Sequence, residues 1–347
     1  MRHLPPIAFL LLLSVSALAQ SPIWTDAYNA SKSGATATTD FTVDNSGNAY
    51  HCGNFTGTAN FDTFKLVANS QDGYVVKTTS AGKVEWAVKL GDTNQDQAVG
   101  VAVDVDGNVY VTGTFLGKFE VQDSSYTAVG SFDSYLVKLN DKGKVQWVSI
   151  ATGNSLQTAT DVAVDESKNV YWFGQYFGSS TIAGRSLAQA GGSYDLFLAK
   201  ISSKGKPIRV KGYGGSSTEL AKLITTNGKH ILFTAQYFGS FSIGSTSISS
   251  SGSYDVAMVK MDTSFSLGWM NSAGGNSIDD VHSISLTSKG AAAIAGTFVS
   301  NFSIGSKSVS GSWYDIYVAM VSTTGSGIWV NKISTTGFGQ NSFIRGL

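Results

Sequence analysis

Short runs of alternating apolar and polar residues, separated by turn-forming residues, follow one another through residues 98–151. Alternation with a period of two is typical of strands with one buried face, and clusters of Gly, Asp and Asn are typical of tight turns. The pattern predicts a turn at DVDGN (104–108), a Gly- and Ser-rich excursion with a strand-like piece at 119–121, and a second turn at DKGK. The predicted strands are AVGVAVD (98–104), VYVTGTF (109–115), SYLVKLN (134–140) and VQWVSIA (145–151).

Three kinds of marker residue indicate that this unit recurs with a period near 61 residues. Trp stands at the start of the fourth strand, with Ile208 in the place of one missing Trp: Trp24, Trp86, Trp147, Trp269 and Trp329. An acidic residue precedes the third strand: Asp72, Asp133, Asp195, Asp255 and Asp315. A small residue lies in the second strand: Gly53, Gly113, Gly174, Ala235 and Gly296. A fixed period of this kind is the signature of a repeat architecture.

A four-stranded meander has an apolar face that it cannot bury alone, so several must pack against one another around an axis. The sequence therefore predicts an all-β protein, a β-propeller of about five four-stranded repeats. The expected units are residues 37–97, 98–158, 159–219, 220–278 and 279–338, with the start of a further unit at 339–347. Trp24 and Trp329 compete for one strand position in a five-bladed ring, so the ring either closes with one of them displaced or continues beyond Leu347.

The repeats resemble the SBBP family, named for its β-propeller repeat and found in many exported bacterial proteins. DVDGNVYVTGTF (104–115) and SFDSYLVKLNDKGKVQW (131–147) carry the likeness, which extends over about residues 24–347. It weakens in the fourth and fifth units, where TNGKHILFTAQY and TSKGAAAIAGTF replace the turn and strand. The resemblance implies a propeller and an extracellular or envelope location, and it implies no particular reaction.

The first nineteen residues predict a secretory signal peptide. Arg2 supplies the positive start, residues 7–13 are apolar, and Ala17-Leu18-Ala19 forms a cleavage site. The apolar run is shorter than the ~20 residues of a spanning helix, so we expect cleavage after Ala19 and a secreted or envelope protein with no later transmembrane segment.

Composition excludes several classes of partner and cofactor. The chain has 24 Lys and Arg against 24 Asp and Glu and no basic run, which argues against nucleic acid. The single Cys52 excludes an intrachain disulfide and a Cys-based zinc cluster, and we expect it to be a small buried hydrophobe.

Candidate metal ligands are sparse, and no cofactor is expected. His51, His230 and His282 share no register, so no metal triad is predicted. DVDGN has oxygen ligands at alternate positions, as a calcium loop would, but its counterparts in other units lose them and Phe115 stands where the final Glu would be. A hairpin turn is the better explanation.

Charged and aromatic residues that recur with the repeat suggest further candidates. Four of the five acidic markers precede a Lys by five positions, and Met320 takes that place after Asp315. The odd spacing sends the two side chains to opposite sheet faces, and we expect the Asp to cap the strand entry. The lysines Lys77, Lys138, Lys200 and Lys260 either form an anion-attracting ring or are solvated stems over apolar surface. The G-K-x-x-W element in DKGKVQW is similar to the Trp-docking repeat of quinone-dependent dehydrogenase propellers, and we interpret it as shared hairpin geometry.

Aromatic residues fall into a regular and an irregular set. The regular register is expected to pack the core: Phe55, Phe115, Tyr176, Tyr237 and Phe298. The irregular set offers candidates for the surface: Trp172, Phe177, Tyr213, Phe238 and Trp313.

These observations favour an exported, non-enzymatic binding or scaffold module for an unknown protein or glycan. Its ligand would contact loops on one face, namely 152–160, 213–219 and 273–280, which link fourth strands to the next first strands. A lectin-like glycan-binding propeller is the first alternative. A propeller-based glycan hydrolase or lyase is the second, and acidic side chains converging near the axis would favour it.

Overall fold

The computed structural model describes residues 31–33, 35–311 and 314–333. These residues form strands, turns and bends, and none of them belongs to a helix long and apolar enough to cross a membrane. The expected signal peptide, Trp24, Trp313 and the start of a further unit at 339–347 lie outside the described residues.

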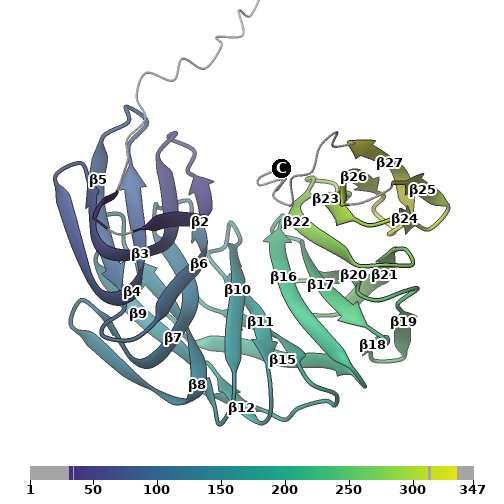
Figure 1. Cartoon of the computed structure of the whole chain (residues 1–347), viewed down its shortest axis with the longest axis horizontal. Helices are drawn as coiled ribbons and strands as arrows, with labels where there is room; N and C mark the ends of the chain where they lie inside the picture. Colours follow the sequence, from purple (N-terminus) through teal and green to yellow (C-terminus); the bar gives the residue numbers. More distant parts are fainter. Residues whose placement is uncertain (1–30, 34, 312–313, 334–347) are drawn as a thin grey trace, which may run out of the picture.

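The described residues form five antiparallel sheets in succession, and Figure 1 shows them side by side in an arc, with the first and fifth sheets at its two ends. Each is built on four strands in chain order, to which some sheets add further short strands. The first sheet has β2 (Thr36–Val43), β3 (Ala49–Phe61), β4 (Phe64–Thr78) and β5 (Val84–Leu90). The second has β6 (Asp96–Val103), β7 (Val109–Val121), β8 (Ser124–Leu139) and β9 (Val145–Gly153). The third has β10 (Gln157–Val164), β11 (Val170–Tyr176), β14 (Asp195–Ile201) and β15 (Pro207–Gly215). The fourth has β16 (Thr218–Thr226), β17 (His230–Phe238), β20 (Asp255–Asp262) and β21 (Leu267–Gly274). The fifth has β22 (Asp279–Leu286), β23 (Ala292–Phe298), β26 (Asp315–Val321) and β27 (Gly327–Ile333).

The all-β fold and the four predicted strands of residues 98–151 are confirmed, and the sheets are those of a β-propeller-like repeat. The strands form where apolar residues alternate, and the turns form at the Asp- and Gly-rich segments between them. In β7 the strand continues to Val121 and so absorbs the short piece expected at 119–121.

The excursion between second and third strands pairs with the preceding sheet, which the sequence pattern did not predict. In the last three repeats this excursion is a hairpin whose first strand bonds to the fourth strand of the sheet before: β9–β12, β15–β18 and β21–β24. The hairpins are β12 (Ser180–Ile182) with β13 (Arg185–Leu187), β18 (Ser240–Ile243) with β19 (Thr246–Ser249), and β24 (Asn301–Ile304) with β25 (Lys307–Ser310). The N-terminal strand β1 (Ser31–Ser33) pairs in the same way with the outer part of β3.

The small residue of each second strand lies beside a bulge in the first strand. A Cβ on Gly113 would lie 1.8 Å from the carbonyl oxygen of Gln97, and one on Gly296 would lie 1.9 Å from that of Asp280. The backbones approach too closely for a larger side chain, and the register shifts by one residue at the same place. The repeated glycine is therefore a packing requirement of the bulge.

Apolar side chains from neighbouring sheets form shared cores between them. Cys52 and Val75 of the first sheet pack in one cluster with Val101 and Val137 of the second. Cys52 is a buried free thiol, as expected. Each sheet thus covers the apolar face of the next, which is the packing that the repeat pattern requires.

Between neighbouring sheets, a Trp of one sheet docks on a turn of the next. The indole nitrogens of Trp86, Trp147 and Trp269 donate to backbone carbonyls 54–56 residues further on: Asp141 at 3.0 Å, Ser203 at 3.1 Å and Thr323 at 3.0 Å. A Cβ on Gly143 would lie 2.8 Å from the Trp86 ring, so the turn glycine makes room for the indole. The interpretation of the G-K-x-x-W element as hairpin geometry alone is therefore wrong: it joins the sheets.

The residue in the place of the missing Trp is Arg209, not Ile208. Lys77 faces Trp86 and Lys138 faces Trp147 in the strand register, and in the third sheet Lys200 faces Arg209. Ile208 is exposed. The sequence spacing already indicates Arg209, because it follows the turn glycine Gly205 by four positions, as Trp147 follows Gly143.

Candidate functional site

The repeated lysines contact the neighbouring sheet and form no anion-binding ring. The ammonium groups of Lys138 and Lys200 donate to the carbonyls of Ser203 and Thr263 at 3.1 Å, and Lys77 reaches that of Asp141 at 3.4 Å. The Lys138 ammonium also lies 5.3 Å from the centre of the Tyr110 ring. The hypothesis of an anion-attracting face is therefore wrong, and Lys77, Lys138 and Lys260 are buried rather than solvated.

The carboxylate of Asp104 accepts hydrogen bonds from its own turn. One oxygen accepts the backbone amides of Asp106 and Asn108 at 2.9 Å, and the other accepts the hydroxyl of Tyr110 at 3.0 Å. Among the described residues no group of three or more His, Cys, Asp or Glu side chains could hold a metal ion. DVDGN is a hairpin turn stabilised by its first residue.

The acidic markers cap strand entries, as expected. Asp133 and Asp255 accept the backbone amides of Val129 and Ser251 at 2.8 Å, and Asp195 accepts that of Ala190. All three carboxylates are buried. Their contacts hold the entry to the third strand.

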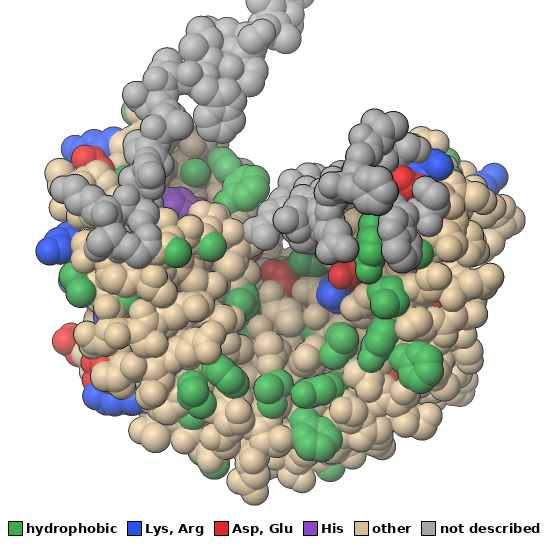
Figure 2. All heavy atoms as spheres, viewed as in Figure 1, with side chains coloured by type: hydrophobic (Ala, Val, Ile, Leu, Met, Phe, Trp, Pro, Cys, Tyr) green, Lys and Arg blue, Asp and Glu red, His purple; other side chains and the backbone are tan. Residues whose placement is uncertain are grey.

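Two carboxylates approach each other on the innermost strands of the arc. Asp40 accepts the backbone amide of Val101 at 2.8 Å, and Asp161 accepts that of Ile224 at the same distance, so each links its sheet to the next. Gly100 lies beside Asp161: a Cβ there would be 3.2 Å from Oδ1. Burial, together with the charge of Asp40, raises the pKa of Asp161 well above its usual range. Figure 2 shows acidic side chains within the hollow at the centre of the view.

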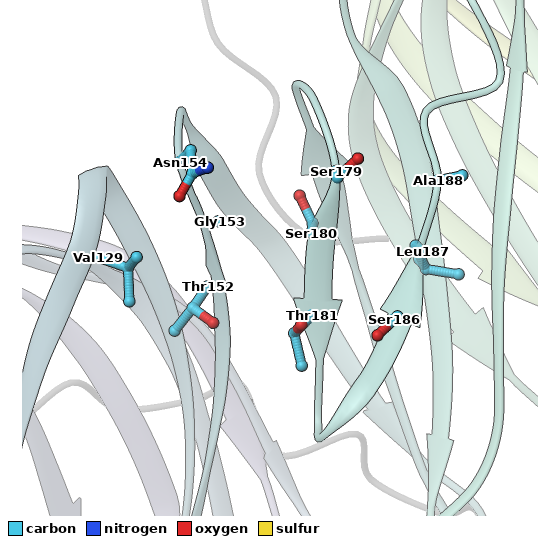
Figure 3. Close-up of a pocket in the computed structure, with 10 residues that line it drawn as sticks. All are labelled: Val129, Thr152, Gly153, Asn154, Ser179, Ser180, Thr181, Ser186, Leu187 and Ala188. Carbon is cyan, nitrogen blue, oxygen red and sulfur yellow. The ribbon is translucent and has the colours of Figure 1, made fainter.

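The loop rim comprises the connections from each fourth strand to the next first strand, residues 91–95, 154–156, 216–217 and 275–278. It carries a recess of about 390 Å³ at the edge of the second sheet. Figure 3 shows β9 with Thr152 and Asn154 on one side of the recess and the hairpin β12–β13 on the other. Hydroxyl, amide and small apolar groups line it, and none of its lining residues is ionisable. The predicted loop 152–160 therefore contributes to a concave surface.

Two aromatic pairs, each an exposed Phe with a partly buried Tyr, occupy equivalent positions beside the loop rim in the third and fourth sheets. The ring centres of Phe177 and Tyr194 lie 5.9 Å apart, and those of Phe238 and Tyr254 lie 6.0 Å apart. Phe177 is 39% exposed and Phe238 46%, against 0% for the preceding residue of each, Tyr176 and Tyr237. The sequence singled out Phe177 and Phe238, and it missed their tyrosine partners because those are separated from them by the excursion.

Other expected aromatic positions have different outcomes. The regular register is buried in the core, as predicted: Phe55, Phe115, Tyr176, Tyr237 and Phe298. Trp172, proposed for the surface, is fully buried and donates to the Thr112 hydroxyl. Tyr213 is also wrong as a surface candidate, because it packs against the core beside Phe233.

The predicted loops 213–219 and 273–280 are shorter than expected. Gly214 and Gly215 pair with β18, and Ala273 and Gly274 pair with β24, so only residues 216–217 and 275–278 remain as connections. Glu219 and Asp279, at the ends of these segments, are buried. Ile278, in the connection 275–278, has an apolar side chain that is 44% exposed.

Residues 85–114, from β5 into the first half of β7, match the SBBP family model, described as a beta-propeller repeat. The chain carries an SBBP repeat. It is also 28% identical over 122 residues to an uncharacterized WD repeat-containing protein of Acanthamoeba polyphaga mimivirus, a match covering 31% of this chain and 9% of that protein. It is 24% identical over 178 residues to the regulatory protein FlaEY of Caulobacter vibrioides, covering 48% of this chain and 18% of that protein. The SBBP chain thus spans a small part of each relative.

Proposed function

We propose that this SBBP-repeat chain is an exported, non-enzymatic binding or scaffold module that holds its ligand on the loop rim. The repeated aromatic pairs carry the proposal, because exposed aromatic rings on a rigid frame are the groups that most often anchor protein and sugar ligands. The similarity to a WD repeat-containing protein supports a module of this class. Export rests on the expected signal peptide at residues 1–19.

The lectin-like alternative is favoured by one specific observation. Phe177 with Tyr194 and Phe238 with Tyr254 place the same pair of rings on two successive sheets. A ligand with a repeating unit, such as a polysaccharide, could contact both pairs and gain affinity from their linkage. The adjacent recess has hydroxyl and amide groups and no ionisable side chain, which suits an uncharged ligand.

The hydrolase alternative rests on Asp40 and Asp161. Glycoside hydrolysis requires two neighbouring carboxyl groups, and burial together with the charge of Asp40 raises the pKa of Asp161, as an acid catalyst would need. Each of them, however, accepts a backbone amide of the next sheet, and this contact gives it a structural role. We therefore rank binding before catalysis. Release of reducing sugar by the wild type, lost in Asp161→Asn, would reverse that order.

A glycan array and a protein pull-down test the binding proposal. The variant Phe177→Ala/Phe238→Ala removes both exposed rings, and we expect any retained ligand to weaken at least ~10-fold, since anchor aromatics contribute about 2 kcal/mol or more. The control is Val105→Ala, which truncates an apolar side chain 61% exposed in the opposite, turn-bearing rim. A ligand bound equally by wild type and double variant would place the site elsewhere.

A further inference from the structure

Buried acidic residues meet in pairs directly beneath the exposed aromatic pairs of the loop rim. Asp195 follows Tyr194 in the chain, and the backbone amide of Glu219 donates to the Tyr194 carbonyl at 3.0 Å. In the next repeat Asp255 follows Tyr254, and the amide of Asp279 donates to the Tyr254 carbonyl at 2.8 Å. We call Asp195 with Glu219 and Asp255 with Asp279 the acid pairs.

The two carboxyl groups of each acid pair lie against one shared glycine or against two consecutive glycines. A Cβ on Gly274 would lie 2.8 Å from Oδ1 of Asp255 and 2.8 Å from Oδ2 of Asp279. In the other pair a Cβ on Gly214 would lie 1.9 Å from Oδ1 of Asp195, and one on Gly215 would lie 3.0 Å from Oε1 of Glu219. Two ionised carboxylates so close together and so deeply buried would repel each other strongly.

Each carboxyl group of the acid pairs keeps one oxygen without a hydrogen-bond partner among the described residues, although all four side chains are at most 1% exposed. The other oxygens of Glu219 and Asp279 accept the loop-rim amides of Gly215 at 3.1 Å and Gly275 at 2.8 Å. These amide donors favour the ionised form and lower the pKa, but burial has the larger effect and raises it. A buried acceptor without a donor needs an explanation, and a proton supplies one.

The second repeat offers a neutral counterpart of the acid pairs. Gln157 stands where Glu219 and Asp279 stand in their repeats, opposite Asp133, and its side chain is fully buried. Its amide nitrogen donates to the Ser180 hydroxyl at 3.0 Å. An amide resembles a protonated carboxyl group in shape and in having a donor, so the fold accepts an uncharged group at this position.

We propose that each acid pair holds one proton between its two carboxyl groups, and that this proton keeps the loop rim ordered beneath the aromatic pairs. Loss of the proton to water leaves two buried negative charges and loosens the connections at Gly215 and Gly275. The molecule thereby senses pH at its loop rim. The consequence for ligand binding, stronger below neutral pH than above it, rests on the proposed function.

Burial, together with a smaller effect of the charges of Asp195 and Asp255, raises the pKa values of Glu219 and Asp279 to about 7. The unfolded values are about 4, so the folded chain binds more protons between pH ~4 and ~7. Stability therefore falls as the pH rises through this window and levels off above it. Asp96 behaves in the same way at the first junction, where it faces Asp72.

Few other titratable groups face the acid pairs. The phenols of Tyr176, Tyr237 and Tyr317 are the neighbours whose pKa values the buried carboxylates raise, and they stay neutral in this window. At the first junction Lys89 pairs with Asp72 at 3.1 Å, which offsets part of the repulsion there. Neither acid pair has such a cation among the described ion pairs.

Thermal unfolding of the full chain between about pH 5 and about pH 8.5, without ligand, tests whether each acid pair holds a proton. We expect the midpoint of the wild type to fall with rising pH, and Glu219→Gln/Asp279→Asn to reduce that fall. Gln157→Glu should create a third acid pair with Asp133 and steepen the fall. If the unfolding midpoint depends on pH in these variants as it does in the wild type, the proposal is overturned. A midpoint that Ca²⁺ raises and EDTA lowers would also overturn it, because a cation would then occupy the acid pair.

Carbon-13 NMR of the side-chain carboxyl groups keeps the test independent of variants that fail to fold. Resonances titrating near pH 7 support the proposal, and titration of all Asp and Glu carboxyls near pH 4 would overturn it. Neither measurement uses a ligand. The conclusion about the shared protons therefore does not depend on whether the loop rim binds a ligand. A ligand whose affinity is equal at both ends of the pH range would overturn the coupling to binding.

Discussion

The indole nitrogen of Trp86, in the fourth strand of the first sheet, donates to the carbonyl oxygen of Asp141 in a turn of the second sheet at 3.0 Å. The ammonium of Lys77 reaches the same carbonyl, because Lys77 and Trp86 face each other in the strand register. One repeat later, Lys138 and Trp147 share the carbonyl of Ser203 in the same manner. Consecutive sheets are thus joined by a contact that recurs with the period of the chain.

Removing the docked indole should destabilise the protein. Trp86 is 6% exposed, so Trp86→Ala loses buried apolar area and leaves a cavity, and we expect the free energy of unfolding to drop by about 3 kcal/mol. Trp86→Phe keeps much of the packing and removes the donor, at a cost nearer ~1 kcal/mol. Urea unfolding measures both. Equal and negligible effects would show that the contact does not hold the sheets together.

The turn glycine beneath the indole should tolerate no side chain. Gly143 has φ +72°, and a Cβ there would lie 2.8 Å from the Trp86 ring. Gly228 has φ +81° with no heavy atom within 4 Å of its Cβ position, so Gly228→Ala measures the backbone strain alone, about 1 kcal/mol. We expect Gly143→Ala to cost at least ~1 kcal/mol more in chemical denaturation. A smaller cost than that of Gly228→Ala would contradict the docking geometry.

The buried lysines should matter for stability and not for anion binding. In Lys138→Met the stem is retained and the donor to Ser203 is lost, while Trp147 still donates to that carbonyl. The fifth sheet already has Met320 at this register position, facing Trp329. We expect a loss of roughly 1 kcal/mol in unfolding free energy and no change in phosphate or sulfate affinity by calorimetry. A weakened anion affinity would restore the charged-ring hypothesis.

Trp172 of the third sheet contacts the second sheet through the buried hydroxyl of Thr112, which we expect to be necessary for stability. Its indole nitrogen donates to the Thr112 hydroxyl at 2.6 Å, and that hydroxyl donates to the Tyr135 carbonyl at 2.8 Å. Thr112→Val preserves the shape of the side chain and leaves the Trp172 indole N–H and the Tyr135 carbonyl without this hydrogen-bond partner. The free energy of unfolding should therefore fall by about 2 kcal/mol. The control is Thr127→Val at an exposed strand position, which should have little effect. Comparable midpoints for the two variants in thermal unfolding would count against the contact.

The strands were predictable because burial imposes its own period on the sequence. In β7 and β8 alternate side chains fill the cores on the two faces of the second sheet, and the turns between the strands carry Asp and Gly. The outer hairpins were not predictable, because their strands are short and mostly polar and bond to the preceding sheet through backbone groups. The sequence leaves no trace of such pairing.

The role of the repeated Trp and Lys could not be deduced from spacing either. Their acceptors are backbone carbonyls, which have no residue preference, in turns more than fifty residues away. The aromatic candidates Phe177 and Phe238 were found because they interrupt a regular register, but Trp172 interrupts it as well and is buried. Only the fold separates an aromatic that faces solvent from one that fills a junction between sheets.

Small-angle X-ray scattering of the purified chain tests most directly whether the sheets pack side by side about a common centre. A compact chain of this length has a radius of gyration of about 20 Å, and we expect that value with a single-peaked distance distribution. A much larger radius, with separate maxima from sheets arranged like beads along the chain, would contradict the packing on which the loop rim and its aromatic pairs depend.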